Sequence, residues 1–495
     1  MQQVALLSVI LVFGSAPALA DRSPTTLNFA DAHVQQPDEP AELAKVSFAR
    51  KVATGANITK HFAKSHTTGL LLRPFSSLRN LVSLTVGATT GFIKDVTLDT
   101  VLLPRLERRG IPPVAMRAGM DLVAWEKDLD RISGTRRTRG SLDLLIDGEA
   151  FFDRLTAEIA SAEKSIKIRT YIFDNDDYSL SIADLLKERS QEIPVDVFVD
   201  GIGTMGGGLI TSRSLPIGFV TPISIESYVE RDSDVNLHML DNTWFMGDHT
   251  KTFIFDDKVA FLGGMNIGRE YRYDWHDMMV ELSGPVVDQL SYDTEKTDAQ
   301  RRLGDLSFLQ RVKRDTKASP EASAELRLLY TKPTDAQIYR AQIHAIRRSQ
   351  SYIYIQNAYL ADDLVLYELA KARHRGVDVR VIVPTRPDSG LMDRSNVLAI
   401  NLLQRHGVRV YLYPGMSHIK AAIYDGWACF GTANFDKLSF KINKEVNIGT
   451  SDPKIVAELK RDIFEVDFAV SQEVFSSRPV YMADHIYEKI VDVIL

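Results

Sequence analysis

From Gly140 onward, the chain alternates short apolar runs typical of β-strands with segments whose apolar residues recur at helical spacing. The first series predicts a strand, a helix, a strand, a helix and a strand over 141–147, 149–164, 165–174, 179–190 and 194–200. The same order recurs about 180 residues later, over 324–331, 335–350, 351–363, 364–376 and 377–384. Such alternation is typical of α/β folds, so the pattern predicts a duplicated α/β domain.

The two copies define two domains, over 140–315 and 325–495, with the polar stretch from Lys313 to Glu325 as the linker between them. The copies differ mainly in an extra segment of the first one, over 206–246. An insertion of this length beside a motif is either a substrate lid or a long surface loop, and the sequence leaves both open.

The first 20 residues have the features of a secretory signal peptide, residues 1–20, cleaved after Ala20. An apolar run extends from Val4 to Phe13 and is followed by small residues, although no Lys or Arg precedes it. A run of about ten residues is shorter than the ~20 that a membrane-spanning helix needs. We therefore expect an exported protein, periplasmic or extracellular and peripheral to the membrane, with no spanning segment after signal removal.

Residues 21–139 form an N-terminal extension ahead of the first domain. The part up to about residue 65 is polar without a sustained period, which predicts an irregular arm. The apolar spacing from about Leu70 to Arg137 predicts short helices, with breaks at Pro104 and at the Pro112-Pro113 pair.

Composition narrows the function only a little. The 495 residues are 45% hydrophobic and 25% charged, which excludes a disordered or fibrous protein. The net charge of -6 gives no overall attraction to nucleic acid. The lone cysteine, Cys429, excludes an intramolecular disulfide and cysteine-based zinc sites, and we expect it to be a small buried residue.

One glycine-rich stretch matches the sequence pattern of a nucleotide-binding site. Gly201, Gly203 and Gly206 match the dinucleotide-binding fingerprint and follow the predicted strand over 194–200. That fingerprint requires a helix to begin at the glycines. Because further glycines and Pro216 follow, the sequence predicts a flexible loop here instead.

Two stretches repeat a set of polar residues, and the His-x-Lys-x4-Asp part has identical spacing in both. The first copy contains His249, Lys251, Asp256, Asn266 and Asp277, and the second contains His418, Lys420, Asp425, Asn434 and Glu445. In both copies the last acid lies eleven residues after the asparagine. A repeat that preserves polar rather than apolar residues indicates shared chemistry.

Strand geometry suggests how each set is used. Residues two apart on a strand share a face, so each histidine should project into the same space as the lysine that follows it. Asp256 and Asp425 have the other parity and fall in predicted turns, which favours a supporting role. Asn266 and Asn434 follow glycines and can offer amide donors to the same space.

Two imidazoles, two ammonium groups and two carboxamides suit the cleavage of a phosphodiester. The lysines and asparagines would orient the phosphate oxygens as charge builds in the transition state. One neutral histidine would attack phosphorus while the other protonates the departing alkoxide, and the residues alone do not decide which does which. Asp277 and Glu445 would each hold the second nitrogen of an imidazole, and His276 is at most a helper. This chemistry needs no metal and no cofactor.

Both stretches resemble the His-x-Lys-x4-Asp signature of the phospholipase D superfamily in its two-copy form, over about residues 140 to 475. They are most similar to the bacterial cardiolipin synthase and phosphatidyltransferase branch. The resemblance implies a mixed sheet flanked by helices in each α/β domain, and a pseudo-twofold pair with the active site at its seam. It further implies that His249 forms a covalent phosphohistidine, that His418 is the acid and base, and that the substrate is a phospholipid at a membrane surface.

Two features depart from that branch. Typical members have transmembrane helices near the N-terminus, and they carry an arginine where this chain has Lys437 ahead of Ser439, a residue expected to help orient the phosphate. Two alternative functions remain: a phosphodiesterase acting on nucleic acid, which the acidic balance disfavours, and a non-catalytic lipid-binding envelope protein. We expect a monomer that does not bind nucleic acid.

Overall fold

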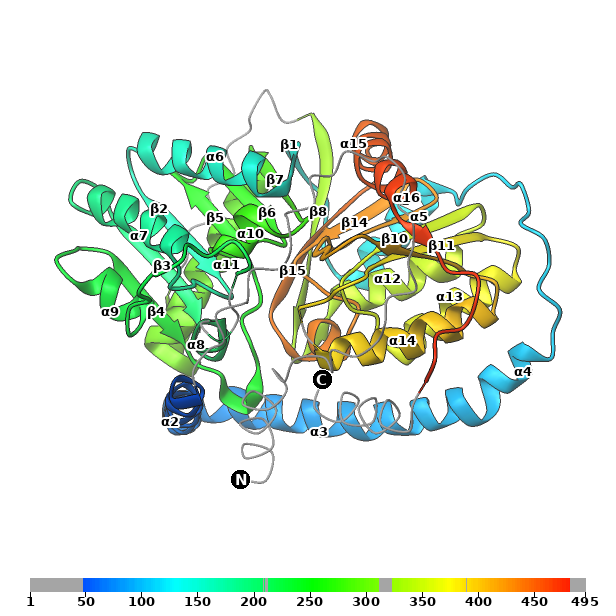
Figure 1. Ribbon diagram of the computed structural model, residues 1–495, viewed down its shortest axis with the longest axis horizontal. Helices are drawn as coiled ribbons and strands as arrows, with labels where there is room; N and C mark the ends of the chain where they lie inside the picture. The colour runs from blue at the N-terminus through cyan, green and yellow to red at the C-terminus, as the bar shows by residue number, and fades with distance from the viewer. Residues whose placement is uncertain (1–47, 208, 210–211, 311–322, 389, 481–495) are drawn as a thin grey trace.

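The computed structural model describes residues 48–480 apart from 208, 210–211, 311–322 and 389. The expected signal peptide and most of the expected linker from Lys313 to Glu325 lie outside the described residues. Figure 1 shows two α/β halves side by side, with one long helix along the lower edge beneath both.

The strands of both halves join in one mixed sheet. In sheet order, the first half contributes β4 (Asn236–Leu240), β3 (Val195–Asp200), β2 (Ile166–Thr170), β5 (Thr252–Phe255), β6 (Val259–Gly263), β7 (Met278–Ser283) and β1 (Thr138–Ile146). The second half repeats this order with β12 (Arg409–Tyr413), β11 (Asp378–Pro384), β10 (Tyr352–Gln356), β13 (Ala421–Tyr424), β14 (Trp427–Gly431), β15 (Glu445–Thr450) and β8 (Ala324–Lys332). The identical order confirms the predicted duplication of an α/β domain.

The two halves meet where β1 pairs with β8 in antiparallel register, Thr138 opposite Leu326 and Gly140 opposite Ala324. Gly140 has no room for a side chain here, because a Cβ would lie 2.8 Å from the carbonyl oxygen of Ser283 in β7 and 3.1 Å from the side chain of Leu326 in β8. Two short strands complete the sheet: β9 (Asp335–Ala336) pairs with β8, and β16 (Gln472–Glu473) pairs with β12.

Helices cover both faces of the sheet (Figure 1). Those of the first half include α6 (Asp147–Ser161), α7 (Asp177–Ser190), α9 (Ile225–Glu230), the 3₁₀ helix η2 (Thr243–Phe245), α10 (Arg269–Tyr273), α11 (Pro285–Leu303) and the 3₁₀ helix η3 (Gly304–Leu309). Those of the second half are α12 (Gln337–Arg348), α13 (Asp363–His374), α14 (Gly390–Arg405), the π-helix η4 (Leu438–Ile442), α15 (Pro453–Leu459), the π-helix η5 (Lys460–Glu465) and α16 (Val466–Val470). Each face of the sheet thereby buries an apolar layer, and Cys429 is buried in one of them, as expected from its type.

The N-terminal extension is more helical than the sequence predicted. Helix α2 (Phe48–Leu72) occupies a stretch interpreted as an irregular arm, and α3 (Pro74–Thr97) is one long helix rather than several short ones. The inward face of α2 is polar: His61 lies 3.1 Å from the amide oxygen of Asn242 and 3.2 Å from the hydroxyl of Ser65. Because much of this face is held by hydrogen bonds, hydrophobic periodicity did not reveal it.

The predicted break at Pro104 is also wrong. Helix α3 continues through the π-helical turn η1 (Leu98–Leu102) into α4 (Leu103–Glu107), where Pro104 lies in the first turn. Because proline has no N–H to donate, the wider π turn before α4 fits a position where that helical hydrogen bond is missing. The predicted break at Pro112-Pro113 agrees with the irregular stretch that precedes α5 (Leu122–Ser133).

The glycine-rich stretch is a helix, α8 (Gly201–Gly207), and not the predicted loop. A Cβ at Gly201 would lie 2.1 Å from the His61 ring, and one at Gly203 would lie 2.7 Å from the Tyr171 ring. These glycines therefore permit the helix to pack against α2 and Tyr171. Close packing accounts for Gly201 and Gly203 of the fingerprint-like spacing without a nucleotide, whereas a Cβ at Gly206 would meet open space.

Candidate active site

The repeated histidines meet at the seam between the two halves. His249 and Lys251 lie in an extended segment that ends where β5 begins at Thr252, and His418 and Lys420 likewise precede β13, which begins at Ala421. The prediction that they lie within strands is wrong by three residues for the histidines and one for the lysines, because the histidine N–H groups bond across the seam. The His249 N–H donates to Lys444 O at 2.9 Å, and the His418 N–H donates to His276 O at 2.7 Å.

These bonds belong to two symmetric bridges between the halves. Asp248 pairs with Lys444, and His276 pairs with Ser417, each in parallel fashion. The residue after each bridging partner is an acid: Glu445 follows Lys444, and Asp277 follows His276. Each bridge therefore delivers the acid of one half to the histidine of the other.

The resulting ion pairs are crossed. Nδ1 of His249 lies 2.9 and 3.0 Å from the two carboxylate oxygens of Glu445, and Nδ1 of His418 lies 2.7 Å from Oδ2 of Asp277. Both acids are fully buried. Holding Nδ1 fixes the orientation of each ring and leaves Nε2 as the nitrogen available for chemistry. Each copy of the motif thus contributes a histidine to one pair and an acid to the other.

The surroundings make the two histidines unequal. Burial, together with the charges of Lys251, Lys420 and His418, lowers the pKa of His249 well below its usual value. Burial and Lys420 also lower the pKa of His418, but the charge and hydrogen bond of Asp277 raise it again in part. Burial raises the pKa of Glu445 well above its usual value, even though Lys251 and the hydroxyls of Thr432 and Ser439 oppose this. Both shifts favour the neutral imidazole, and the pKa of His418 is lowered less than that of His249, so His418 is the more basic of the two.

Both lysines are buried beside the histidines. Burial lowers the pKa of Lys251 to about 7 and that of Lys420 to about 8. Nζ of Lys251 donates to His249 O at 2.9 Å, and Nζ of Lys420 donates to His418 O at 2.6 Å. Each ammonium keeps two further N–H groups, so an arriving phosphate would find donors and would restore full protonation.

The structure places the remaining predicted phosphate-orienting residues in the same region, with different surroundings. Asn266 accepts from Ile172 N at 3.0 Å and donates to the Tyr271 hydroxyl at 2.7 Å, so it also fixes the first-half loops. Oδ1 of Asn434 is buried without a hydrogen-bond partner among the described residues. Ser439 is buried in η4, where its hydroxyl acts on Glu445.

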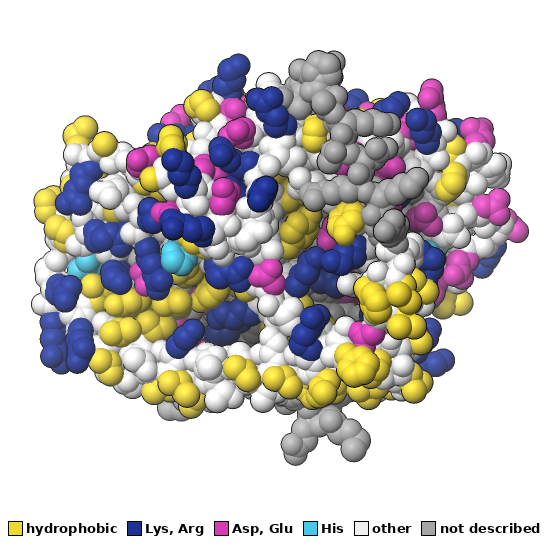
Figure 2. Space-filling view, turned by 180° about the vertical axis from the view of Figure 1, so that it is seen from behind, with side chains coloured by type: hydrophobic (Ala, Val, Ile, Leu, Met, Phe, Trp, Pro, Cys, Tyr) yellow, Lys and Arg dark blue, Asp and Glu magenta, His cyan; other side chains and the backbone are white. Residues whose placement is uncertain are grey.

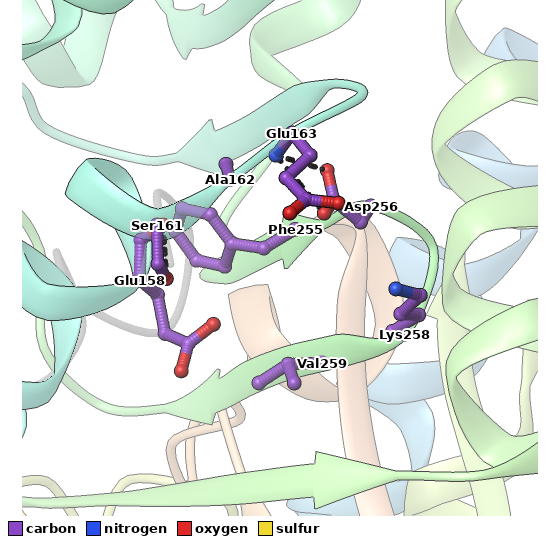
Figure 3. Close-up of a pocket in the computed structure, with 8 residues that line it drawn as sticks. All are labelled: Glu158, Ser161, Ala162, Glu163, Phe255, Asp256, Lys258 and Val259. Atoms are coloured by element: carbon purple, nitrogen blue, oxygen red, sulfur yellow. Dashed lines mark hydrogen bonds between the residues drawn. The ribbon is translucent and has the colours of Figure 1, made fainter.

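Asp256 and Asp425 lie at the opposite ends of β5 and β13 from the histidines. Both adopt left-handed backbone conformations, with φ of 56° and 55°. Asp256 accepts the backbone N–H groups of Glu163, Lys164 and Ser165, beside a pocket of about 230 Å³ (Figure 3). Asp425 accepts four backbone N–H groups, those of Met120, Gln350, Ser351 and Tyr352. These aspartates hold turns that position β2 and β10, and neither contacts a histidine of the site.

We expect Asp425→Asn to destabilise the fold by about 2 kcal/mol, because its amide would face N–H donors that now meet a carboxylate oxygen. Asp256→Asn should cost about 1 kcal/mol, since three of its four contacts converge on one oxygen that an amide can replace. Urea unfolding measures both losses. Activity per folded molecule should stay within about twofold of wild type, and a larger loss in fully folded protein would return these residues to the catalytic group.

Three aromatic residues that the sequence analysis did not single out line the histidines. The Tyr171 ring lies 4.7 Å from that of His249, and the rings of Trp275 and Tyr271 lie 5.3 and 5.8 Å from that of His418. Tyr171 also lies 5.2 Å beneath Nζ of Lys251. Tyr171 follows β2, which is antiparallel to β5, so strand pairing could have placed it at the end of the sheet that holds His249.

His276 ties the halves together. Its Nδ1 lies 2.6 Å from Asp147 of the first half, and its Nε2 lies 2.9 Å from Asp467 of the second. Burial lowers its pKa, but the two carboxylates outweigh this and raise it to about 10. His276 is therefore a charged clamp whose carbonyl holds the His418 backbone, which makes it a positioning residue.

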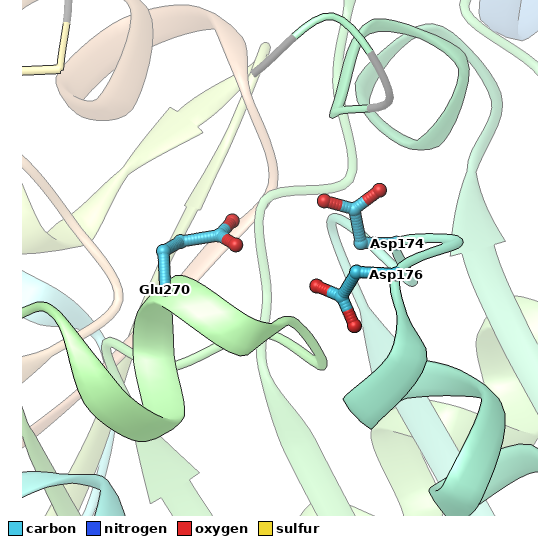
Figure 4. Close-up of side chains that lie close together, drawn as sticks. All are labelled: Asp174, Asp176 and Glu270. Carbon is cyan, nitrogen blue, oxygen red and sulfur yellow. The ribbon is translucent and has the colours of Figure 1, made fainter. Parts of the chain in front are cut away.

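Three buried carboxylates lie together next to the first-half loops of the site. Asp174, Asp176 and Glu270 offer oxygens within 4.8 Å of one another, and Figure 4 shows Glu270 of α10 pointing toward the two aspartates ahead of α7. Burial and mutual repulsion raise the pKa of Asp174 to about 7 and that of Glu270 well above its usual value. In the absence of a cation this cluster holds protons near neutral pH, and its donor set is the kind that Mg²⁺ or Ca²⁺ binds.

Comparison with known proteins points to one family. The family model described as "Cardiolipin synthase, PLD-like domain" matches residues 155–296 and 342–466, which contain both histidines and both crossed acids. Cardiolipin synthase A of Pseudomonas fluorescens is 29% identical over 350 residues, which cover 67% of this chain and 69% of that protein. Cardiolipin synthase A of Pseudomonas putida is 30% identical over 356 residues, with the same shares covered.

Among solved structures, phosphatidylserine synthase of Haemophilus influenzae has a TM-score of 0.57 and covers 75% of this chain and 100% of its own. At 13% identity this likeness is one of fold. It agrees with the duplicated α/β architecture.

Proposed function

Because the chain belongs to the cardiolipin synthase, phospholipase D-like domain family, we propose that it transfers a phosphatidyl group from a phospholipid to an alcohol, through a covalent phosphohistidine on His249. Cardiolipin is the product we propose, formed when the acceptor is the glycerol headgroup of a second lipid. The observation that carries this proposal is the crossed pair of histidine–acid contacts at the seam, which frees two Nε2 atoms for one phosphodiester.

In the first step, Nε2 of His249 attacks phosphorus and the bond from phosphorus to the headgroup oxygen breaks. The proton on His418 Nε2 passes to that oxygen. In the second step, neutral His418 takes the proton of the acceptor hydroxyl, whose oxygen attacks phosphorus and releases His249. The strongly lowered pKa of His249 supports its role as nucleophile, and the partial restoration by Asp277 supports His418 as proton carrier. Lys251 and Lys420 would hold the phosphate oxygens.

The proposal is tested by mixing the full chain with phosphatidylglycerol labelled in its phosphate and quenching within milliseconds to seconds, with chelator present. We expect labelled protein whose label is stable to base and labile to acid, as a phosphoramidate is, together with release of one glycerol per label. Mass spectrometry of the lipid products should find cardiolipin. Label that persists in His249→Ala, or turnover without any labelled protein, would contradict the mechanism.

A parallel assay with plasmid DNA separates this function from nucleic-acid cleavage at the same site. We expect no nicking under conditions that give lipid turnover, because the chain as a whole is acidic. Nicking without lipid turnover would overturn the proposed substrate class.

A further inference from the structure

Helix α3 exposes an apolar face along its whole length. Exposed apolar side chains lie on one face of α3 at Phe75, Leu78, Val82, Val86, Ile93 and Val96, three, four or seven residues apart, and Phe92 adds to the same surface. Phe75 is 80% exposed and Phe92 is 71% exposed. A helix of 24 residues is about 36 Å long, so the stripe exceeds the scattered apolar residues of an ordinary surface. We call these exposed apolar residues, from Phe75 to Val96, the α3 stripe.

The opposite face of α3 is fixed to the body of the protein. The carboxylate of Asp305 accepts the N–H groups of Phe75 and Ser76, and Nε1 of Trp244 donates to Ser77 O at 3.1 Å. Near the other end, Lys437 lies 3.1 Å from Asp95. These contacts hold the α3 stripe outward. The apolar surface continues onto η3, where Leu306, Phe308 and Leu309 are also exposed.

The charge of this region is opposite to that of the chain. Residues 48–97 contain seven Lys and Arg, namely Arg50, Lys51, Lys60, Lys64, Arg73, Arg79 and Lys94, and one acid, Asp95, whereas the whole chain has a net charge of -6. Of these, Lys60, Lys64, Arg79 and Lys94 are exposed. Figure 2 shows apolar side chains along the lower edge, where α3 runs in Figure 1, with Lys and Arg above them.

We propose that the α3 stripe is a docking surface for a bilayer that contains anionic lipid, with α3 lying in the plane of the interface. An apolar helix face flanked by basic residues fits the boundary between headgroups and acyl chains. Within residues 48–480, apart from the gaps already named, no helix has the length and apolar content to cross a membrane. The proposal rests on the proposed function, because a phosphatidyl donor is held in a bilayer.

Helices α2 and α3 contact the segments that lead to the catalytic seam. Phe245 packs against Phe62 of α2 with ring centroids 4.2 Å apart, and His249 follows Phe245 by four residues. At the second half, Lys437 holds Asp95 of α3 and precedes Ser439 by two residues. A membrane bound by α3 therefore lies beside the segments that carry both halves of the site. The end of the 206–246 insertion serves here as the anchor of α2 and α3.

The test measures how the full chain partitions onto vesicles of phosphatidylethanolamine and phosphatidylglycerol. The variant Phe75→Ser/Phe92→Ser should lower the partition coefficient at least about tenfold, because it removes two of the largest apolar side chains from the interface. The matched control, Val123→Ser/Phe475→Ser, changes side chains that are 69% and 83% exposed on other elements and should bind as wild type does. Equal binding by wild type and the α3 variant would overturn the proposal.

Two further arms identify the occupant and separate this inference from the proposed function. Sedimentation without lipid should find the same species for wild type and Phe75→Ser/Phe92→Ser; a wild-type dimer that this variant disperses would assign the stripe to a second copy instead. In detergent micelles the variant should transfer phosphatidyl groups within about twofold of the wild-type rate. If neither protein acts in micelles, the proposed function fails, and the vesicle result still decides the docking surface.

Discussion

His249→Ala and His418→Ala are each expected to lower the transfer rate on phosphatidylglycerol in mixed micelles by about 10³-fold or more, and the double variant should be no worse than the more damaging single one. The two Nε2 atoms act on the same phosphodiester, so removing either leaves the other without its partner in the reaction. Because His249 is the nucleophile of the proposal, its variant should also fail to take up label, whereas the His418 variant should label slowly.

The control for this experiment is His238→Ala, which removes a partly buried imidazole from β4. Its Nε2 lies 3.9 Å from Oδ1 of Asp196, a long contact, and it touches none of the four residues of the crossed pairs. It should retain wild-type activity within about twofold. Comparable losses in all three variants would mean that activity reports folding and not the seam.

The sequence was sufficient to predict the residues of the site because the chemistry is repeated. Two copies of the same polar spacing identified His249, Lys251, His418 and Lys420, and the strand–helix order predicted a duplicated α/β domain that the sheet order confirms. Strand parity was less reliable. It placed the histidines within strands, but their backbone N–H groups bond to the opposite half, so β5 and β13 begin only after the lysines.

The pairing of histidines with acids could not be predicted in this way. Asp277 lies 28 residues after His249, and Glu445 lies 27 residues after His418. This spacing gives no sign that each acid pairs with the histidine of the other copy. The exchange arises from the bridges between Asp248 and Lys444 and between His276 and Ser417, which join residues far apart in the chain. Contacts across a seam depend on how two folded halves meet, and periodicity within one half contains no information on that.

Helix α2 shows a second limit. Its buried residues include His61, Ser65 and Gly69, and polar or small residues of this kind are usually taken to lie at the surface. The helix is held by hydrogen bonds to Asn242 and Thr243 at the end of the 206–246 insertion. The packing of α2 also explains the first glycine of the fingerprint-like stretch, because a Cβ at Gly201 would meet the His61 ring. Where packing partners are polar and distant in sequence, local patterns describe neither element.

The crossed contacts predict that each acid variant will behave like a weakened form of the histidine it touches, and not like the histidine of its own motif. Asp277→Asn and Glu445→Gln should each lower transfer by about 10²–10⁴-fold, because an amide no longer favours the Nδ1-protonated, correctly oriented ring. Both substitutions keep the shape of buried side chains, so unfolding in urea checks that the fold is retained.

A phosphatidyl ester with an acidic leaving group, such as p-nitrophenol, separates the two acids. Such a leaving group needs no proton, so loss of His418 function should still allow the first step and then stall the second. His418→Ala and Asp277→Asn should therefore release a burst of about one equivalent of p-nitrophenolate per enzyme. His249→Ala and Glu445→Gln should release no burst. If Asp277→Asn instead groups with His249→Ala, the acids act within their own motifs, and the 2.7 Å contact between His418 and Asp277 is not the one used in catalysis.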